Sequence, residues 1–283
     1  MDFRTIIPIK PQPFITRDTQ FLLLGSCFAE NIGQRLIDHR FQVDMNPFGV
    51  LYNPLSIAQA IERLLSGKPF TANELFQHND LWHSWLHHGS FSDQSKEKAL
   101  EKMNERFTLA NQNLKKTDLL TITFGSAWVY EFEGNVVANC HKVPNKLFVR
   151  RRLTIDEIVA RYTALFSALR KENPALKILI SVSPIRYAAT ENQTSKATLL
   201  LATEALCQQC KDVRYFPAYE ILLDELRDYR FFADDMVHPS PMAVQYVWER
   251  FAQTYFTPNT LALLPEIEKE NRHAAHRPLH AEN

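Results

Sequence analysis

The chain has 283 residues, of which 45% are hydrophobic and 11% aromatic, a composition that supports a large folded core and excludes an intrinsically disordered chain. Its 32 Lys and Arg residues balance 32 Asp and Glu residues, so the net formal charge is zero. This balance argues against nucleic acid or an anionic membrane surface as a partner and favours a small-molecule ligand.

The amino-terminal stretch MDFRTIIPIKPQPF lacks the long apolar run of a secretory signal, and no segment reaches the roughly 18 apolar residues of a spanning helix. The 4 cysteines are unevenly spaced and do not form a disulfide framework. We therefore expect a cytoplasmic protein with no membrane span.

The first secondary structure is predicted in the sequence FLLLGSCFAENIGQRL, residues 21–36. Its unbroken apolar run, 21–24, fits a strand buried on both faces, and apolar residues then recur at helical spacing up to about residue 40. Gly25 and Ser26 lie between the two. A serine there places a hydroxyl at the carboxyl end of a strand, where open α/β sheets bind ligands. An ordinary helix N-cap is the alternative interpretation.

The rest of the chain alternates between strand and helix patterns. The segments typical of strands are 41–45, 118–125, 176–184 and 213–217, and those typical of helices are 54–65, 155–171, 192–210 and 241–255. Residues 128–140 indicate a hairpin turning at Glu133-Gly134-Asn135, and residues 67–115 a helical insertion. This alternation predicts one α/β domain, a three-layer sandwich with a central, mostly parallel sheet. We expect its core to span about 18–256, before a tail, 257–283, with one short helix and a loose polar end.

A second polar motif, ADDMVHPSP, precedes the last predicted helix. Ser240 and Pro241 are a favourable N-cap and first-turn pair, so His238 lies in the loop just before the helix. Asp235, three residues earlier, is placed to accept a hydrogen bond from the imidazole Nδ1, which leaves Nε2 free as a base. Asp234 is the alternative carboxylate.

The order Ser26, Asp235, His238, with the last two as D-x-x-H, resembles the SGNH or GDSL-like hydrolases. The motif GSCFA at 25–29 is the name-giving motif of the GSCFA family, which is similar to SGNH hydrolases. The stretches NPFGVLYNP, TFGSAWVY, NCHKVPN and SVSPIR resemble that family as well, and the resemblance covers about residues 20–255. It implies the flavodoxin-like α/β fold of SGNH hydrolases.

The resemblance also implies residue roles. Ser26 would be the nucleophile, His238 the general base that activates it, and Asp235 the residue that orients the base. The backbone N–H groups of Ser26 and Gly49 would donate to the oxyanion.

A third oxyanion donor is where this sequence departs from the SGNH pattern. The asparagine of a G-x-N-D motif is replaced by Ala127 in the stretch Gly125-Ser126-Ala127-Trp128. We rank Ser126 first as the replacement donor. The other candidates for this role or for substrate contacts are Asn46, Asn139, His141 and Arg186, for which a polar loop or a surface salt bridge is the alternative.

Other reactive residue types are given structural interpretations. Cys27 is an alternative nucleophile, because a thiolate at a helix start is stabilised, but the family pattern favours Ser26. The three histidines of HSWLHHG would share a metal only in a helix, and no acidic or cysteine ligand accompanies them, so no metal is expected. Cys207 and Cys210 are expected to be core or surface cysteines and not a redox or zinc site, and the run 150–152 to be solvated charge.

These features predict a serine hydrolase of the carboxyl esterase or deacetylase type that acts on ester bonds through a Ser-Asp-His acyl-enzyme. The family's relatives suggest an O-acylated carbohydrate as substrate, and no cofactor is expected. The alternatives are an O-acyltransferase with the same triad, and a non-catalytic carbohydrate-binding module, which the missing asparagine favours. The sequence specifies neither the acyl group nor the oligomeric state, nor whether the His/Trp segment 82–88 contacts substrate.

Overall fold

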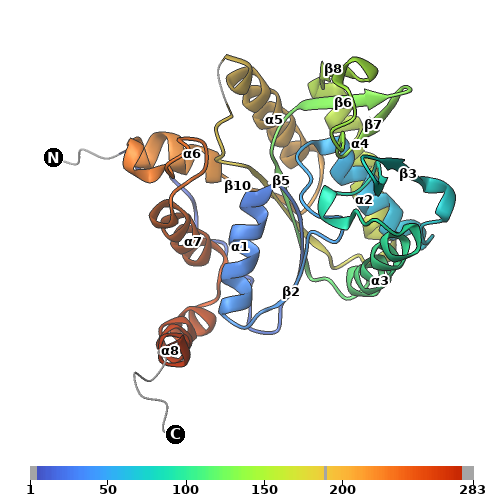
Figure 1. Cartoon of the computed structure of the whole chain (residues 1–283). Coiled ribbons are helices and arrows are strands. Elements are labelled where there is room, and N and C mark those ends of the chain that lie inside the picture. Colours follow the sequence, from blue (N-terminus) through green and yellow to red (C-terminus); the bar gives the residue numbers. More distant parts are fainter. Residues whose placement is uncertain (1–4, 188–189, 276–283) are drawn as a thin grey trace, which may run out of the picture.

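The centre of the computed structural model is a parallel β-sheet, drawn with its covering helices in Figure 1. The structure describes residues 5–187 and 190–275. The strands of this sheet are β1 (Gln20–Gly25), β2 (Gln42–Met45), β5 (Leu119–Phe124), β9 (Lys177–Val182) and β10 (Val213–Phe216). Their spatial order is β10-β9-β5-β1-β2, and each neighbouring pair is parallel. The predicted α/β class and the five strands predicted for its sheet are therefore confirmed.

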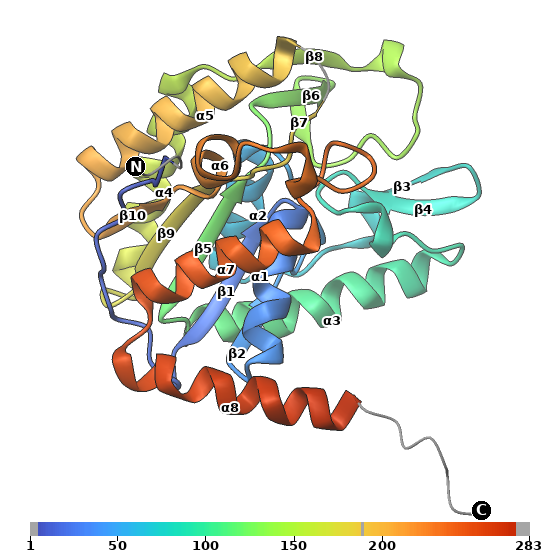
Figure 2. The ribbon, with the colours of Figure 1, turned by 90° about the vertical axis from the view of Figure 1, so that its left-hand side faces the viewer.

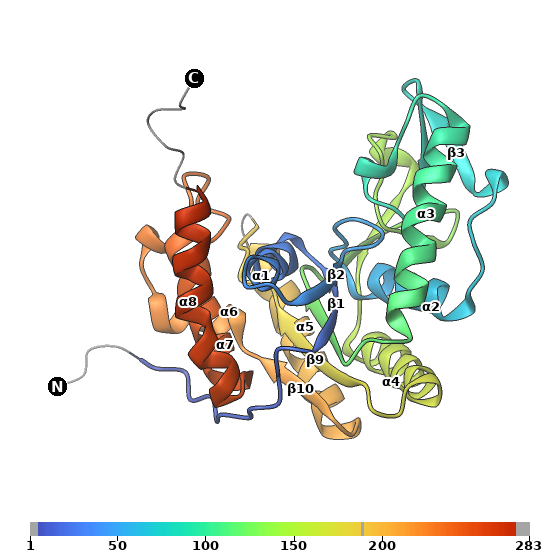
Figure 3. The ribbon, with the colours of Figure 1, turned by 90° about the horizontal axis from the view of Figure 1, so that it is seen from below.

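Two layers of helices cover the two faces of the sheet (Figure 3). Because successive strand residues point to opposite faces, Leu22 and Leu24 pack into one layer and Phe21 and Leu23 into the other. The first layer contains α2 (Pro54–Ser66), α3 (Lys96–Leu114), α4 (Ile155–Glu172) and α5 (Thr190–Gln209). The second contains α1 (Cys27–Asp38), the short α6 (Ala218–Glu220) and α7 (Pro241–Tyr255). Burial on both faces explains why the strands are continuous apolar runs in the sequence.

Residues 67–115 hold more than the predicted helical insertion. The short turn η1 (Ala72–Glu74) leads into an antiparallel hairpin of β3 (Leu75–His78) and β4 (Leu81–Ser84), and the turn η2 (Gly89–Phe91) precedes α3. The hairpin strands are only 4 residues each and mix His, Trp and polar residues, so they lack a clear alternating pattern. On α3, Ala99, Met103 and Phe107 are buried in the main core, so this helix is part of the sandwich.

A second small sheet follows β5. It has the order β7-β6-β8 and consists of β6 (Trp128–Phe132), β7 (Asn135–Val137) and β8 (Val149–Arg152), with the turn η3 (Asn145–Leu147) before β8. The predicted hairpin is confirmed by β6 and β7. The arginine run, predicted as solvated charge, forms strand β8: Arg150 and Arg152 are exposed, as predicted, while Arg151 is half-buried and pairs with Glu131 of β6 at 2.8 Å.

The carboxyl-terminal part returns to the second helix layer. Between α6 and α7 lie a π-helical segment, η4 (Ile221–Leu226), and the turn η5 (Tyr229–Phe231), and after α7 comes α8 (Pro258–Ala275). The predicted short tail helix is thus an 18-residue helix, and the predicted loose end, 276–283, lies outside the described residues. None of the helices in the described part of the chain has the length and apolar character needed to cross a lipid bilayer.

Candidate active site

Ser26 lies at the junction of β1 and α1. It is the N-cap residue of α1, with an extended backbone (φ −69°, ψ 171°), but its side chain caps no helix N–H group. Its Oγ atom is buried and has no hydrogen-bond partner among the described residues. Ser26 is thus the N-cap by position, as the alternative interpretation expected, but its hydroxyl makes no capping bond and has no partner among the described residues.

Two glycines let the chain close tightly around Ser26. Gly25 has a φ of +144°, and a Cβ atom there would lie 2.2 Å from the carbonyl oxygen of Thr123 on β5. A Cβ atom on Gly125 would lie 3.0 Å from the Tyr52 carbonyl oxygen and 3.3 Å from the Ser26 Cβ. Both positions favour glycine, because backbone and side chain approach the same point.

Asp235 and His238 form a hydrogen-bonded pair in the loop before α7. The Nδ1 atom of His238 lies 2.6 Å from Oδ2 of Asp235, and Oδ1 accepts from the backbone N–H groups of Val237 and His238 at 2.9 Å each. These bonds, first that from the His238 backbone, lower the pKa of Asp235 to about 2. An ionised carboxylate only accepts hydrogen bonds, so Nδ1 carries the proton and Nε2 is left as the basic nitrogen. Asp235, and not Asp234, makes this contact.

The loop that carries His238 lies at the carboxyl end of the sheet, near the start of α1 (Figure 2). The backbone N–H of Arg186, in the segment after β9, donates to the Val237 carbonyl at 3.0 Å, which ties the two loops together. No hydrogen bond joins Ser26 to His238, because the Ser26 Oγ has no partner among the described residues. Catalytic hydrogen bonds are often long or poorly aligned until substrate binds. The missing Ser26–His238 bond therefore does not exclude the catalytic role of these residues, which stays a prediction.

The expected oxyanion donors are engaged elsewhere in this conformation. The Ser26 N–H donates to the Thr123 carbonyl at 3.2 Å, and the Gly49 N–H donates to the Asn46 carbonyl at 2.8 Å. The Ser126 Oγ accepts from the Trp128 N–H at 3.1 Å. The two backbone N–H groups would have to exchange their present bonds for one to a ligand, whereas the Ser126 hydroxyl, which lies 3.3 Å from the Ser195 Oγ, can still donate while it accepts from Trp128.

The other candidate residues are spread around this centre. Asn46 accepts from the Gly25 N–H at 2.9 Å and so fixes the end of β1. Asn139 accepts from the His141 N–H at 2.8 Å, and the His141 Nε2 donates to the Ser84 carbonyl at 2.9 Å. Burial lowers the pKa of His141 to about 4, so its ring is neutral near pH 7. The structure thus brings Asn139 and His141 together, and in this conformation both fix the loops that they contact.

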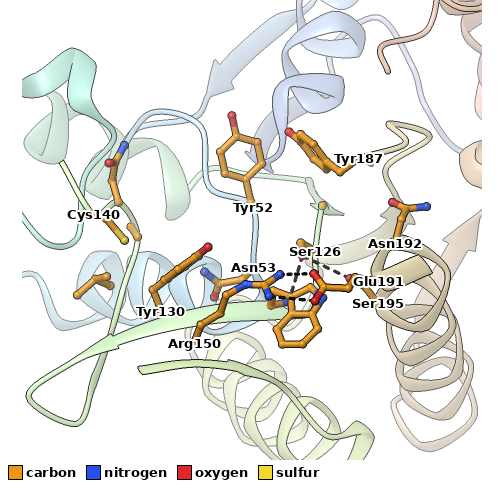
Figure 4. A pocket seen from close by; sticks show the side chains of 15 residues that line it. Tyr52, Asn53, Ser126, Tyr130, Cys140, Arg150, Tyr187, Glu191, Asn192 and Ser195 are labelled. Carbon is orange, nitrogen blue, oxygen red and sulfur yellow. Dashed lines mark hydrogen bonds and ion pairs between the residues drawn. The ribbon is translucent and has the colours of Figure 1, made fainter. Parts of the chain in front are cut away.

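A cavity of about 570 Å³ opens beside the Ser26 junction, with Gly125 and Ser126 in its wall. Figure 4 shows Tyr52 and Tyr187 on one side and the paired Arg150 and Glu191 on the other. The rings of Tyr52 and Tyr187 meet edge to face at 6.3 Å. The remaining lining residues are Asn53, Trp128, Tyr130, Val137, Ala138, Asn139, Cys140, Asn192 and Ser195.

Two polar atoms of the cavity wall are buried without a partner among the described residues. They are the Nδ2 atom of Asn192 and the indole Nε1 of Trp128, both hydrogen-bond donors. Buried donors of this kind are costly unless a ligand or water accepts from them. Both atoms have almost no exposed surface, so a ligand in the cavity could accept from them only after the wall moves. The sequence indicated part of this wall, because Tyr52 lies in NPFGVLYNP and Trp128 in TFGSAWVY, two stretches that resemble the family. Asn192 lies in no such stretch.

The remaining reactive residues do not form a metal or redox site. No group of His, Cys, Asp or Glu in the described residues is arranged to hold a metal ion. His83 lies on strand β4, so the helical spacing of the three histidines does not occur. Burial raises the pKa of the Cys27 thiol, against the opposing effect of the Cys27 and Phe28 N–H groups, which disfavours the thiolate that an alternative nucleophile needs. Cys207 is a free thiol near the end of α5.

Comparison with known proteins identifies the family. A model of the GSCFA family matches residues 20–251. No curated protein sequence matches the chain. Among solved structures, an acetyl xylan esterase from the rumen bacterium Butyrivibrio proteoclasticus is similar with a TM-score of 0.44 and 12% identity, over 91% of this chain and 66% of that one. A carbohydrate esterase family 3 protein from Talaromyces cellulolyticus has a TM-score of 0.40 and 14% identity, over 88% and 99% of the two chains.

Proposed function

The chain belongs to the GSCFA family, and on that premise we propose that it is a serine esterase of the SGNH type. The observation that carries the proposal is the Asp235–His238 pair, with Nδ1 held at 2.6 Å and Nε2 left as a base at the carboxyl end of the sheet. Ser26, whose hydroxyl has no hydrogen-bond partner among the described residues, is the nucleophile for that base.

The reaction proceeds in two halves. The Nε2 atom of His238 takes the Ser26 proton while Oγ bonds to the acyl carbon and the carbonyl electrons move to the oxygen. The tetrahedral intermediate collapses, the leaving alkoxide takes the proton from His238, and an acyl-enzyme remains. Water, activated by the same base, then releases the acid and restores Ser26. Asp235 keeps its charge throughout and holds the imidazole in one tautomer.

The cavity suggests which part of the substrate it receives. At about 570 Å³ it is far larger than an acetyl group, so we assign it to the alcohol part of the ester. Its aromatic rings suit the faces of a sugar ring, and the polar side chains that also line it suit sugar hydroxyl groups. An O-acylated carbohydrate is therefore the substrate class that we propose.

A second candidate, a non-catalytic carbohydrate-binding module, is favoured by one observation. The N–H groups of Ser26 and Gly49 already donate to carbonyls, and Ala127 offers no side-chain donor, so an oxyanion would need rearrangement of the site. Such a module would bind sugars in the cavity and leave Ser26 unacylated.

Acylation decides between the two. The purified protein is treated with a fluorophosphonate probe and with p-nitrophenyl acetate, and the adduct is followed by intact mass. We expect labelling that disappears in Ser26→Ala, falls in His238→Ala and persists in the matched control Cys27→Ala. A folded protein that binds sugar but is not labelled would support the binding module, and labelling lost only in Cys27→Ala would overturn the choice of nucleophile. Product analysis with added sugar acceptors distinguishes hydrolysis from acyl transfer.

A further inference from the structure

Lys196 on α5 places a buried ammonium group at the carboxyl end of the sheet. The residue is 1% exposed, and its Nζ atom donates to the carbonyl oxygens of Gly125 and Ser183, each at 2.7 Å. Gly125 directly follows β5 and Ser183 directly follows β9. One side chain thus ties together the ends of two central strands.

This charge has no counter-ion in the described part of the chain, where no carboxylate forms an ion pair with Lys196. The titratable groups that face it are the Cys27 thiol on α1 and the Tyr219 ring on α6, whose centre lies 5.7 Å from Nζ. Burial lowers the pKa of Lys196 to about 7. An unpaired buried charge disfavours folding, and a neutral donor could equally well donate to the two carbonyls. The stability of the fold alone therefore does not explain why a charged side chain occupies this position.

The neighbourhood of Lys196 is the wall of the proposed active site. The carbonyl that it holds belongs to Gly125, whose Cα is so near Ser26 that a Cβ there would lie 3.3 Å from the Ser26 Cβ. The preceding residue, Ser195, accepts from the Ala127 N–H at 2.8 Å, so α5 fixes this turn at two points. The Lys196 ammonium therefore bonds the carbonyl of a residue that lies against Ser26, and it also interacts electrostatically with Cys27, the first residue of α1.

We propose that Lys196 is a positioning residue for acyl transfer at Ser26: it holds the Gly125–Ala127 turn against the nucleophile, and its charge stabilises the oxyanion of the tetrahedral intermediate. The inference rests on the proposed esterase function. Lys196 exchanges no proton in the reaction. It acts through the field of a fixed charge in a site of low dielectric, where such effects are larger than in water.

The test compares two uncharged replacements. Lys196→Met keeps the length of the side chain, and Lys196→Gln keeps a hydrogen-bond donor without the charge. Lys177→Met, at the amino end of β9, is the matched control. We expect both Lys196 variants to lower kcat for p-nitrophenyl acetate, and the rate of fluorophosphonate labelling, by about 10- to 100-fold, with KM within about threefold and the control unchanged. Circular dichroism and thermal unfolding establish that each variant is folded.

The pH profile separates the charge from a purely structural tie. In the wild-type protein, kcat falls as the pH rises through about 7, because Lys196 then loses its proton. The fall is absent in Lys196→Met and persists in Cys27→Ala and Tyr219→Phe, which remove the two titratable neighbours.

Three outcomes would contradict the proposal. A kcat equal to that of the wild type in Lys196→Met or in Lys196→Gln would show that the charge is dispensable. A kcat of the wild-type protein that does not fall above pH 7 would show this as well, even where a variant fails to fold. In those cases labelling that still requires Ser26 leaves the esterase function intact. A wild-type protein that reacts with neither probe contradicts both proposals.

Discussion

The guanidinium carbon of Arg150 lies 3.9 Å from the centre of the Trp128 ring, on the wall of the cavity. The same guanidinium is held by Glu191 of α5 at 2.6 Å, so β8 and α5 meet across the indole. This arrangement orients the indole, whose Nε1 is a buried donor without a partner in the described residues.

Removal of Arg150 should therefore weaken binding of a large substrate more than of a small one. We expect Arg150→Ala to raise KM for an acetylated disaccharide by about 5- to 20-fold, because a stacked cation on an aromatic ring contributes about 0.5–2 kcal/mol and the indole loses its support. KM for p-nitrophenyl acetate should change by less than about twofold. Steady-state kinetics with both substrates measure the difference.

Arg161→Ala is the control, since Arg161 forms a comparable ion pair with Glu62 outside the cavity. Equal changes for both substrates in Arg150→Ala, or a similar change in Arg161→Ala, would show that the cavity does not receive the alcohol part.

The sequence predicted the parallel sheet and the Asp235–His238 contact because both depend on short-range patterns. Buried strands are continuous apolar runs, and D-x-x-H before an N-cap brings the two side chains together within one loop. The cavity wall could not be predicted in the same way. Arg150 is distant in sequence from Trp128 and Glu191, so its local pattern indicated only solvated charge and not its contacts in the wall of the cavity.

Lys196 shows the same limit more strongly. Its helix has no clear apolar stripe that would mark position 196 as buried. The neighbouring sequence also does not predict the hydrogen bonds of Lys196 to the carbonyls of Gly125 and Ser183. The expected oxyanion donors were assigned by family resemblance, which carries no information about the carbonyls that occupy them here.

Asp235 should be essential for the rate and not for binding. We expect Asp235→Asn to lower kcat for p-nitrophenyl acetate by about 10²- to 10⁴-fold with little change in KM, because the amide favours the wrong imidazole tautomer. Asp234→Asn is the matched control and should retain near wild-type kcat.

The pH dependence of that rate follows from the lowered pKa of Asp235, about 2. The carboxylate stays ionised at every pH above about 3, so we expect protonation of Asp235 to contribute nothing to the change of kcat between pH 5 and 9. An Asp235→Asn variant with wild-type kcat would exclude Asp235 from this role.

Lys196 should also leave a signature in the pH dependence of stability. Its folded-state pKa of about 7 is below the ordinary lysine pKa of 10.5, so between these values the unfolded chain binds one more proton than the folded chain. Unfolding then takes up a proton, and the free energy of unfolding rises with pH in this window. We expect that rise in the wild-type protein relative to Lys196→Met, measured by urea unfolding at pH 6, 8 and 9.5.

The sign of this difference is the informative result. The gap between the two proteins should be constant below about pH 7 and should shift in favour of the wild type as the pH rises. Parallel curves over the whole range would mean that the folded and unfolded pKa values of Lys196 are equal, which contradicts its burial.

Gly25 should be the least replaceable residue of the junction that presents Ser26. Its φ of +144° is strained for any other residue, and a Cβ atom would lie 2.2 Å from the Thr123 carbonyl oxygen in the middle of the sheet. We expect Gly25→Ala to lower the free energy of unfolding by more than about 3 kcal/mol, because neither the backbone of β5 nor that of β1 has room to move. Chemical denaturation followed by circular dichroism measures the change.

Gly134→Ala provides the matched comparison, because Gly134 also has a positive φ, +78°, but has no atom within 4 Å of a Cβ placed there. It should lose only the conformational term of about 1–2 kcal/mol. Equal losses in the two variants would mean that the contact with β5 does not constrain the junction, and that Ser26 is positioned by the helix start alone.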